Sequence, residues 1–211
     1  MTRRAPTPTL RQLAGACLAA LCLADMAAAH AWSLTMTAAS RRVFLHVGNG
    51  TLDATNGTVN LVQVTVPATA IGNGLAQGMT SNSTQANSLY GDNYATCPTP
   101  STQLMIGASY RRSNASNGPA SATLSVTSPP SLSNASGDTI PFTEISWTVS
   151  APGSSVPNVI PAGTFSGGTQ TLATVPANTY IENCHTYSYA NSEVRAAGTY
   201  NGRVTYTLSS P

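Results

Sequence analysis

Lysine is absent from this chain of 211 residues, and charged side chains of every kind make up only 8% of it. The positive charge comes from nine arginines, which occur singly or in pairs along the sequence. Nucleic-acid recognition depends on clustered positive charge that neutralises phosphates. The composition therefore predicts that nucleic acid is not a partner of this protein.

Motifs for catalysis and for metal binding are also missing. The chain has no GxSxG elbow, no paired CxxC, no HExxH and no Asp-rich calcium loop. His46 and His185 are the only histidines after residue 31, and we expect them to be hydrogen-bonded or exposed. His185 follows Cys184, but adjacent residues of a strand point to opposite faces, so the two should not act together. The sequence predicts no enzyme activity, no catalytic residue, no cofactor and no metal site.

The chain has a single long apolar run, which spans residues 13–24. Three arginines precede this run, and residues 29–31 follow the small-x-small rule of a signal-peptidase site. Twelve apolar residues are too few to cross a bilayer. We therefore expect residues 1–31 to be a cleaved signal peptide and residues 32–211 to form one exported domain without a transmembrane segment.

Cleavage at this point would change both the charge and the cysteine count. Six arginines and six acidic residues would remain, so the exported chain would carry no net charge, which favours association between copies. Two cysteines would remain, Cys97 and Cys184. In an oxidising compartment such a pair is most simply a disulfide, and the alternative is two free buried thiols.

Beyond residue 31, apolar residues recur with a period of two, which is typical of half-buried β-strands. No segment keeps a helical period over ten residues, and residues 67–101 indicate a long loop, with room for one helical turn. Strands are predicted over residues 32–38, 41–47, 59–66, 103–112, 122–126, 142–149, 169–175, 183–190 and 200–208. Short strands separated by Gly, Pro and Asn indicate an all-β protein, an antiparallel β-sandwich.

The clearest alternation lies near the C-terminus. One face of this expected closing strand carries Tyr200, Val204, Tyr206 and Leu208. Such a strand needs a pairing partner earlier in the chain or in another chain. Residues 32–38 offer one, because their alternation places four apolar residues on one face: Trp32, Leu34, Met36 and Ala38.

Two arginine pairs flank expected strands, Arg41-Arg42 and Arg111-Arg112. They are interpreted as solvated strand ends that discourage pairing between sheet edges. The alternative is that they contact an acidic patch on a neighbouring subunit.

Three tyrosines near polar loops, Tyr180, Tyr187 and Tyr189, suggest a second kind of function. Tyrosine rings stack on sugars, although tyrosine is also a common strand residue. A secreted carbohydrate-binding, lectin-like β-sandwich with a glycan receptor is therefore the alternative to a structural protein.

The C-terminal sequence Gly198-Thr199-Tyr200, followed by Val204-Thr205-Tyr206-Thr207-Leu208, resembles the closing strand of spore-coat-U-like and fimbrial subunits of Gram-negative bacteria. The signal peptide, the single cysteine pair, the Thr/Ser/Asn/Gly bias and the alternating segment 32–38 are similar to that group. The resemblance implies an immunoglobulin-like β-sandwich that is secreted through the inner membrane. It also implies handling by a periplasmic chaperone and an outer-membrane usher, and a final place in a fimbrium or at the cell surface.

On this basis we expect a non-enzymatic structural or adhesive subunit of a surface fibre or coat, whose partners are copies of itself or related subunits. Residues 32–38 would be the assembly strand, donated to the sheet of a neighbour. The alternative is that these residues pair within their own domain as its first strand.

Overall fold

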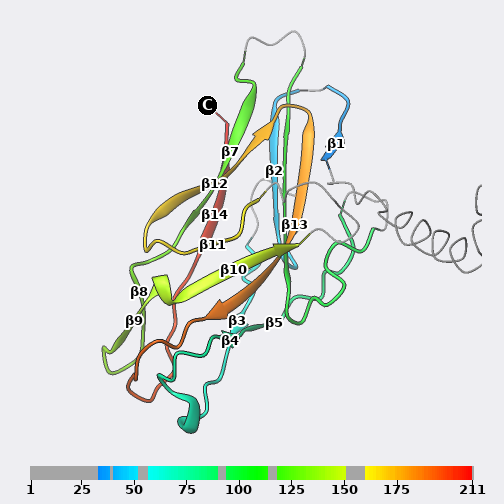
Figure 1. The fold of residues 1–211 in the computed structure, drawn as a ribbon. Helices are drawn as coiled ribbons and strands as arrows, with labels where there is room; N and C mark the ends of the chain where they lie inside the picture. The colour runs from blue at the N-terminus through cyan, green and yellow to red at the C-terminus, as the bar shows by residue number, and fades with distance from the viewer. Residues whose placement is uncertain are drawn as a thin grey trace, which may run out of the picture.

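The computed structural model describes residues 33–38, 40–51, 57–89, 94–113, 118–150 and 160–210. These residues form antiparallel sheets and two short 3-10 turns, which confirms the all-β prediction (Figure 1). The turns are η1 (Ala68–Ala70) and η2 (Phe142–Glu144). The strands are β1 (Ser33–Thr35), β2 (Arg42–Val47), β3 (Val62–Gln63), β4 (Gln77–Gly78), β5 (Thr80–Ser81), β6 (Leu104–Arg111), β7 (Ser121–Thr127), β8 (Ser131–Ser133), β9 (Thr139–Pro141), β10 (Ile145–Ser150), β11 (Gly163–Thr164), β12 (Thr169–Pro176), β13 (Thr179–Tyr189) and β14 (Thr205–Ser209). In the described ranges, no helix has the length and apolar character needed to cross a bilayer.

The larger sheet is organised around β13, which pairs on both of its edges. One edge pairs with β6 along the first half of β13 and with β4 at its end. The other edge pairs with β1 along the first half and with β10 along the second half. Beyond these neighbours, β2 extends the sheet next to β6, and β11 extends it next to β10. The smaller sheet has the order β12-β7-β14.

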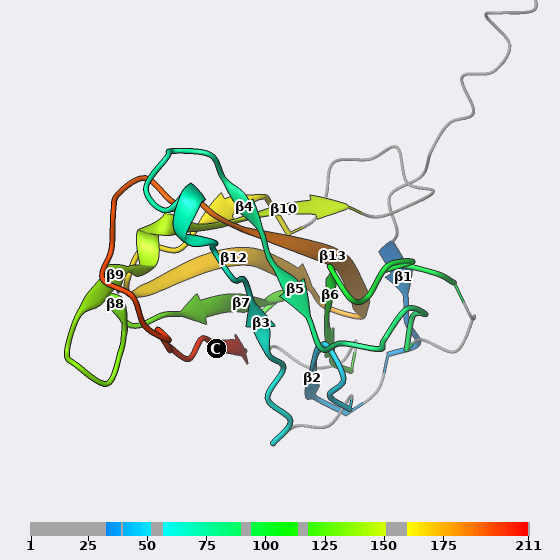
Figure 2. The ribbon, with the colours of Figure 1, turned by 90° about the horizontal axis from the view of Figure 1, so that it is seen from below.

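The two sheets enclose the main apolar core, with β7 and β14 on one side of the molecule and β10 on the other (Figure 2). Alternate residues of β6 and β7 point into it, including Ile106 and Leu124, which are both fully buried. Trp147 and Phe165 pack with ring centroids 4.8 Å apart. Each such side chain contributes about 1.5–3 kcal/mol when it is fully buried. The period of two seen in the sequence is therefore the pattern of a sheet face that covers a core.

The closing strand is shorter than predicted and has a different partner. β14 begins at Thr205 and pairs with β7, whereas residues 33–35 lie in the other sheet. Leu208 is buried and Tyr206 is half-buried against the core. The Tyr206 hydroxyl lies 2.7 Å from that of Tyr187 and so links the two sheets. Tyr200 lies outside the strand, where its hydroxyl donates to the Ala196 carbonyl over 2.8 Å.

Side-chain amides explain why the strand predicted over residues 59–66 is reduced to β3. The Asn60 amide group donates to the Val47 carbonyl over 3.0 Å. The Leu61 amide donates to the side-chain oxygen of Asn82 over 2.9 Å. These bonds replace the backbone ladder that a longer strand would need. Only Val62–Gln63 then pair, with β5.

Other element boundaries also differ from those predicted. The strand predicted over residues 183–190 begins four residues earlier, because Asn178 adopts a φ of 58° and completes a tight turn after β12. Residues 142–144 form η2 instead of the start of a strand. The long loop predicted over residues 67–101 contains the helical turn η1 and the short strands β4 and β5.

Candidate functional site

The N-terminal strand lies on the larger sheet of its own chain. β1 pairs with the start of β13 over three residue pairs, with Leu34 opposite Tyr180, and the Met36 amide donates to the Asn178 carbonyl over 2.7 Å. β1 therefore covers residues 179–181 of the β13 edge, which β10 leaves unpaired. This is the internal pairing that the sequence left open as an alternative to donation. Met36 and Ala38 are half-buried, and Trp32 lies outside the described residues.

The outer face of the larger sheet, which points away from the smaller sheet, carries rows of side chains across β13, β6 and β2. Residues directly opposite each other on antiparallel strands share a face. The first row is Glu182, Gly107 and His46, the second is Tyr180, Ser109 and Phe44, and the third is Arg111 and Arg42. Most of this face is buried, because the described parts of the loop over residues 82–103, which are 82–89 and 94–103, lie against it.

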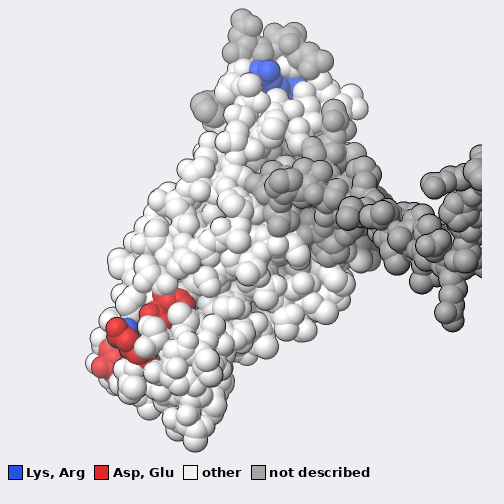
Figure 3. Space-filling view, in the orientation of Figure 1, with Lys and Arg blue, Asp and Glu red and all other residues white. Residues whose placement is uncertain are grey.

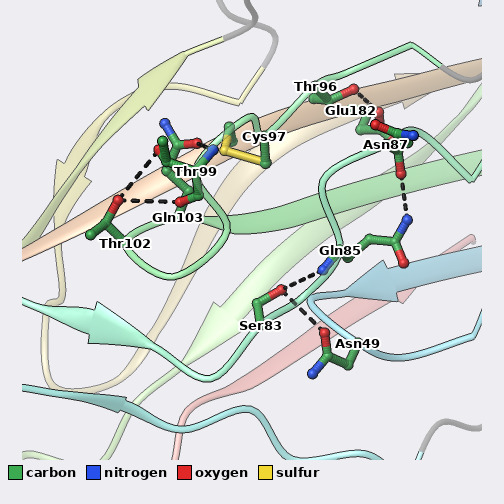
Figure 4. The surroundings of a disulfide bond; sticks show 11 residues. Asn49, Ser83, Gln85, Asn87, Thr96, Cys97, Thr99, Thr102, Gln103 and Glu182 are labelled. Atoms are coloured by element: carbon green, nitrogen blue, oxygen red, sulfur yellow. Dashed lines mark hydrogen bonds between the residues drawn. A yellow bond between two sulfur atoms is a disulfide. The ribbon is translucent and has the colours of Figure 1, made fainter.

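The cysteines confirm the disulfide prediction, and their bond anchors this loop. Cys97 and Cys184 are bonded with their Cα atoms 5.4 Å apart, and both are fully buried beside Met105 (Figure 4). Cys184 lies on the outer face of β13, two residues after Glu182. The bond therefore holds the loop against the centre of the sheet.

Glu182 is buried on the outer face, where hydroxyl groups satisfy its carboxyl oxygens. The Thr96 and Tyr180 hydroxyls donate to it at short distance, and Ser88 donates over 3.3 Å. Thr96 and Ser88 come from the loop that the disulfide anchors, as Figure 4 shows for Thr96. Because an unpaired buried carboxyl is costly, these bonds favour the closed position of the loop.

Sequence reasoning missed this polar cluster because it placed the start of the strand at residue 183. Glu182 then lay in a loop, where an acidic residue is unremarkable. The available signal was its position two residues from Cys184, since residues i and i+2 share a strand face. An acidic residue on the face of a buried cysteine needs nearby donors.

Gly107 has no side chain, and the Tyr180 ring occupies the space that a side chain at residue 107 would fill. A Cβ at residue 107 would lie 2.6 Å from the Tyr180 hydroxyl oxygen. We expect Gly107→Ala to lower the free energy of unfolding by about 1–3 kcal/mol, because the ring must move away from Glu182. Urea denaturation would measure the change. Gly78→Ala is the matched control, since Gly78 also lies in a strand of this sheet but has open space around its Cβ position. Equal stability of the two variants would contradict this packing role.

Both histidines are fully buried, and in the described part of the chain the ring nitrogens of His185 have no hydrogen-bond partner. The expectation that the histidines are hydrogen-bonded or exposed is therefore wrong for His185, whereas the backbone of Gly48 and Gly50 interacts with the His46 ring. Burial lowers the pKa of His46 to about 4, although the backbone of Gly50 and Gly48 partly offsets this. Burial lowers the pKa of His185 to about 3. Both rings are neutral at pH 7.

The histidines lie on opposite faces of the larger sheet. His185 faces the core, where its ring stacks on that of Trp147 with centroids 6.3 Å apart, while Cys184 faces outward. His46 shares the outer face with Glu182, but Gly107 lies between them, and no hydrogen bond joins the His46 ring to Glu182. Among the described residues, no three His, Cys, Asp or Glu side chains gather as a metal site would require.

The three tyrosines proposed as a sugar platform do not form one. Tyr180, Tyr187 and Tyr189 are only 2%, 5% and 8% exposed. Tyr180 also lies on the outer face, whereas Tyr187 and Tyr189, at odd positions of the same strand, point the other way. Their rings pack inside the protein and are not available to stack on a sugar in this structure.

The strands β2 and β14 are each an edge strand of one of the two sheets, and they lie next to each other. In the described chain, β2 pairs with β6 alone and β14 pairs with β7 alone. Leu45 of β2 and Val204, which directly precedes β14, are half-buried apolar residues that pack against the core. The Arg41 side chain crosses between them and donates to the Ser210 hydroxyl over 2.9 Å. Comparison of the chain with protein-family models, with curated proteins and with solved structures gave no match.

Proposed function

We propose that this protein is a non-enzymatic structural or adhesive subunit of a bacterial surface fibre or coat, assembled by strand exchange. In this mechanism residues 32–38 leave β13 of their own chain and pair with β13 of another copy or a related subunit. The observation that carries the proposal is the small contact that holds the N-terminal segment. β1 covers the edge of the central strand with three residue pairs, and it lies next to the N-terminal end of the exported chain.

The energetics favour such an exchange. Each backbone hydrogen bond contributes about 0.5–1.5 kcal/mol net, so three residue pairs hold β1 weakly compared with the long pairs of β6 and β10. Segments with few contacts open at lower free energy than the core does. The pairs lost in one copy form again in its neighbour, so the exchange itself costs little.

The open edges of β2 and β14 support the same proposal. An edge strand presents unpaired N–H and C=O groups to any strand that reaches it. These two edges lie side by side and carry half-buried apolar residues. In a subunit that assembles, such edges can pair with a strand of a neighbouring copy. The lack of net charge permits copies to approach one another closely.

The finer features of the proposal follow the resemblance to fimbrial and spore-coat-U-like subunits. We infer that the two-layered antiparallel fold is immunoglobulin-like and that residues 1–31 direct export through the inner membrane. A chaperone and an usher would then act on the protein in the periplasm. The disulfide is consistent with that oxidising compartment. The lectin-like alternative has no supporting observation, since its three tyrosines are buried.

Deletion of residues 32–38 tests the proposal. The exported variant should fold, form the Cys97–Cys184 bond and remain monomeric in size-exclusion chromatography with light scattering. It should bind a synthetic peptide of residues 32–38 at one peptide per chain, because that peptide restores the pairs on β13. The intact protein should form multimers.

A peptide in which Trp32, Leu34 and Met36 are replaced by serine is the matched control and should not bind. The proposal fails if the deletion unfolds the domain while the intact protein stays a stable monomer.

A further inference from the structure

A pocket of about 370 Å³ lies on the outer face of the larger sheet, beside the N-terminal segment. Its volume falls within the range of about 300–1,000 Å³ that is usual for small-molecule sites. The lining residues are Met36, Thr37, Phe44, Leu89, Ser109, Arg111 and Tyr180. Phe44, Ser109 and Tyr180 form the second row across the sheet, and Met36 and Leu89 come from the segments at its sides. The pocket therefore combines apolar walls with one cationic side chain.

The Arg111 side chain gives this pocket a positive charge and a hydrogen-bond donor that lacks an acceptor. One terminal nitrogen donates to the Thr37 carbonyl over 2.9 Å, but the Nε–H is buried and has no partner among the described residues. Arg42 lies directly opposite Arg111 on the neighbouring strand. Two like charges at such a position repel each other, and a bound anion would relieve this repulsion.

The acidic residues that the structure describes do not neutralise the charge of Arg111. Acidic side chains gather at the far end of the visible surface, whereas basic ones gather at the opposite end (Figure 3). Glu193 pairs with Arg195 at 2.6 Å. Glu182 is nearer to the pocket, but it accepts bonds from three hydroxyl groups. An anion from outside the chain is thus the complementary partner for Arg111.

We propose that this pocket binds a monocarboxylate with a flexible apolar chain. The carboxylate pairs with the Arg111 guanidinium, and the chain lies against Met36, Phe44 and Leu89. A purely inorganic anion would leave the apolar walls in contact with water, and a neutral alcohol would not neutralise the charge of the guanidinium.

Binding would also bear on assembly, because Met36 and Thr37 belong to the segment that the proposed function donates. A ligand that contacts them stabilises the state in which this segment stays on its own chain. This consequence rests on the proposed function. Binding itself is a property of the single chain and is tested separately.

Isothermal titration of the exported, disulfide-bonded protein with octanoate tests the site. Octanoate should bind at one per chain, and 1-octanol and acetate should bind at least about tenfold more weakly, since each lacks half of the recognised chemistry. Arg111→Met should weaken octanoate binding by about 10- to 100-fold. Arg112→Met is the control and should bind as the unmodified protein does, because Arg112 donates to the Gly118 carbonyl outside the pocket.

A second variant and a second readout keep the test independent of the stability of Arg111→Met. Leu89→Asp should also abolish binding, since it places a charged group against the apolar chain of the ligand. In the unmodified protein, octanoate should shift the NMR signal of the ¹³C-labelled Met36 methyl group. The proposal is overturned if octanoate and octanol bind equally, if the Arg111 and Arg112 variants bind alike, or if octanoate does not bind.

Discussion

Removal of the Cys97–Cys184 bond should lower the free energy of unfolding by about 4–5 kcal/mol. The bond joins residues 87 positions apart, and closing so long a loop removes much of the conformational entropy of the unfolded chain. Natural domains are stable by only about 5–15 kcal/mol, so this loss is a large share of the total. The native state should change as well, because the bond anchors the loop that carries Thr96 to Glu182.

Urea denaturation of the Cys97→Ala/Cys184→Ala variant would measure this loss against the unmodified protein. Hydrogen exchange should locate the native-state change in residues 82–103, with little change in β7 and β12 of the smaller sheet. Reduction of the unmodified protein should reproduce both effects, which separates loss of the bond from loss of the sulfur atoms. A change below about 1 kcal/mol would show that the loop is held by its hydrogen bonds instead.

Acidification from pH 7.5 to about pH 5 should destabilise the protein by about 4 kcal/mol. In the folded chain His46 and His185 stay neutral down to pKa values of about 4 and 3, whereas the same groups in the unfolded chain titrate near 6.5. Below pH 6.5 the unfolded state therefore binds more protons than the folded state, and stability falls as the pH falls. Each histidine accounts for about 2 kcal/mol of this destabilisation at pH 5.

Urea denaturation at several pH values would test this dependence. His185→Phe should remove about half of it, because phenylalanine has a similar ring for stacking on Trp147 and carries no proton. His46→Leu should remove most of the other half. A free energy of unfolding that is constant between pH 7.5 and pH 5, or an unchanged slope in both variants, would show that the rings become protonated without unfolding.

The sequence by itself determined the structural class and the covalent link. Alternation at period two is a local property of an extended chain, so it could be read without knowing which strand pairs with which. This is why β7 and β12 were predicted almost to their ends. The disulfide could be predicted for a different reason, since two cysteines after residue 31 allow a single intramolecular pairing.

Only the tertiary structure decided which faces are buried and which strands are neighbours. β13 is buried without interruption from Tyr180 to His185, because the smaller sheet covers one face and the anchored loop covers the other. A period of two reveals one covered face but not a second. The burial of the tyrosines and the role of Glu182 therefore could not be predicted.

The pairing of β1 was decided in the same way. Residues 33–35 can pair with any open strand edge, and alternation in sequence does not say which edge is free. The edge became available because β10 pairs with β13 only from Cys184 onward. That limit follows from where two distant segments meet in space, which no local pattern in the sequence records.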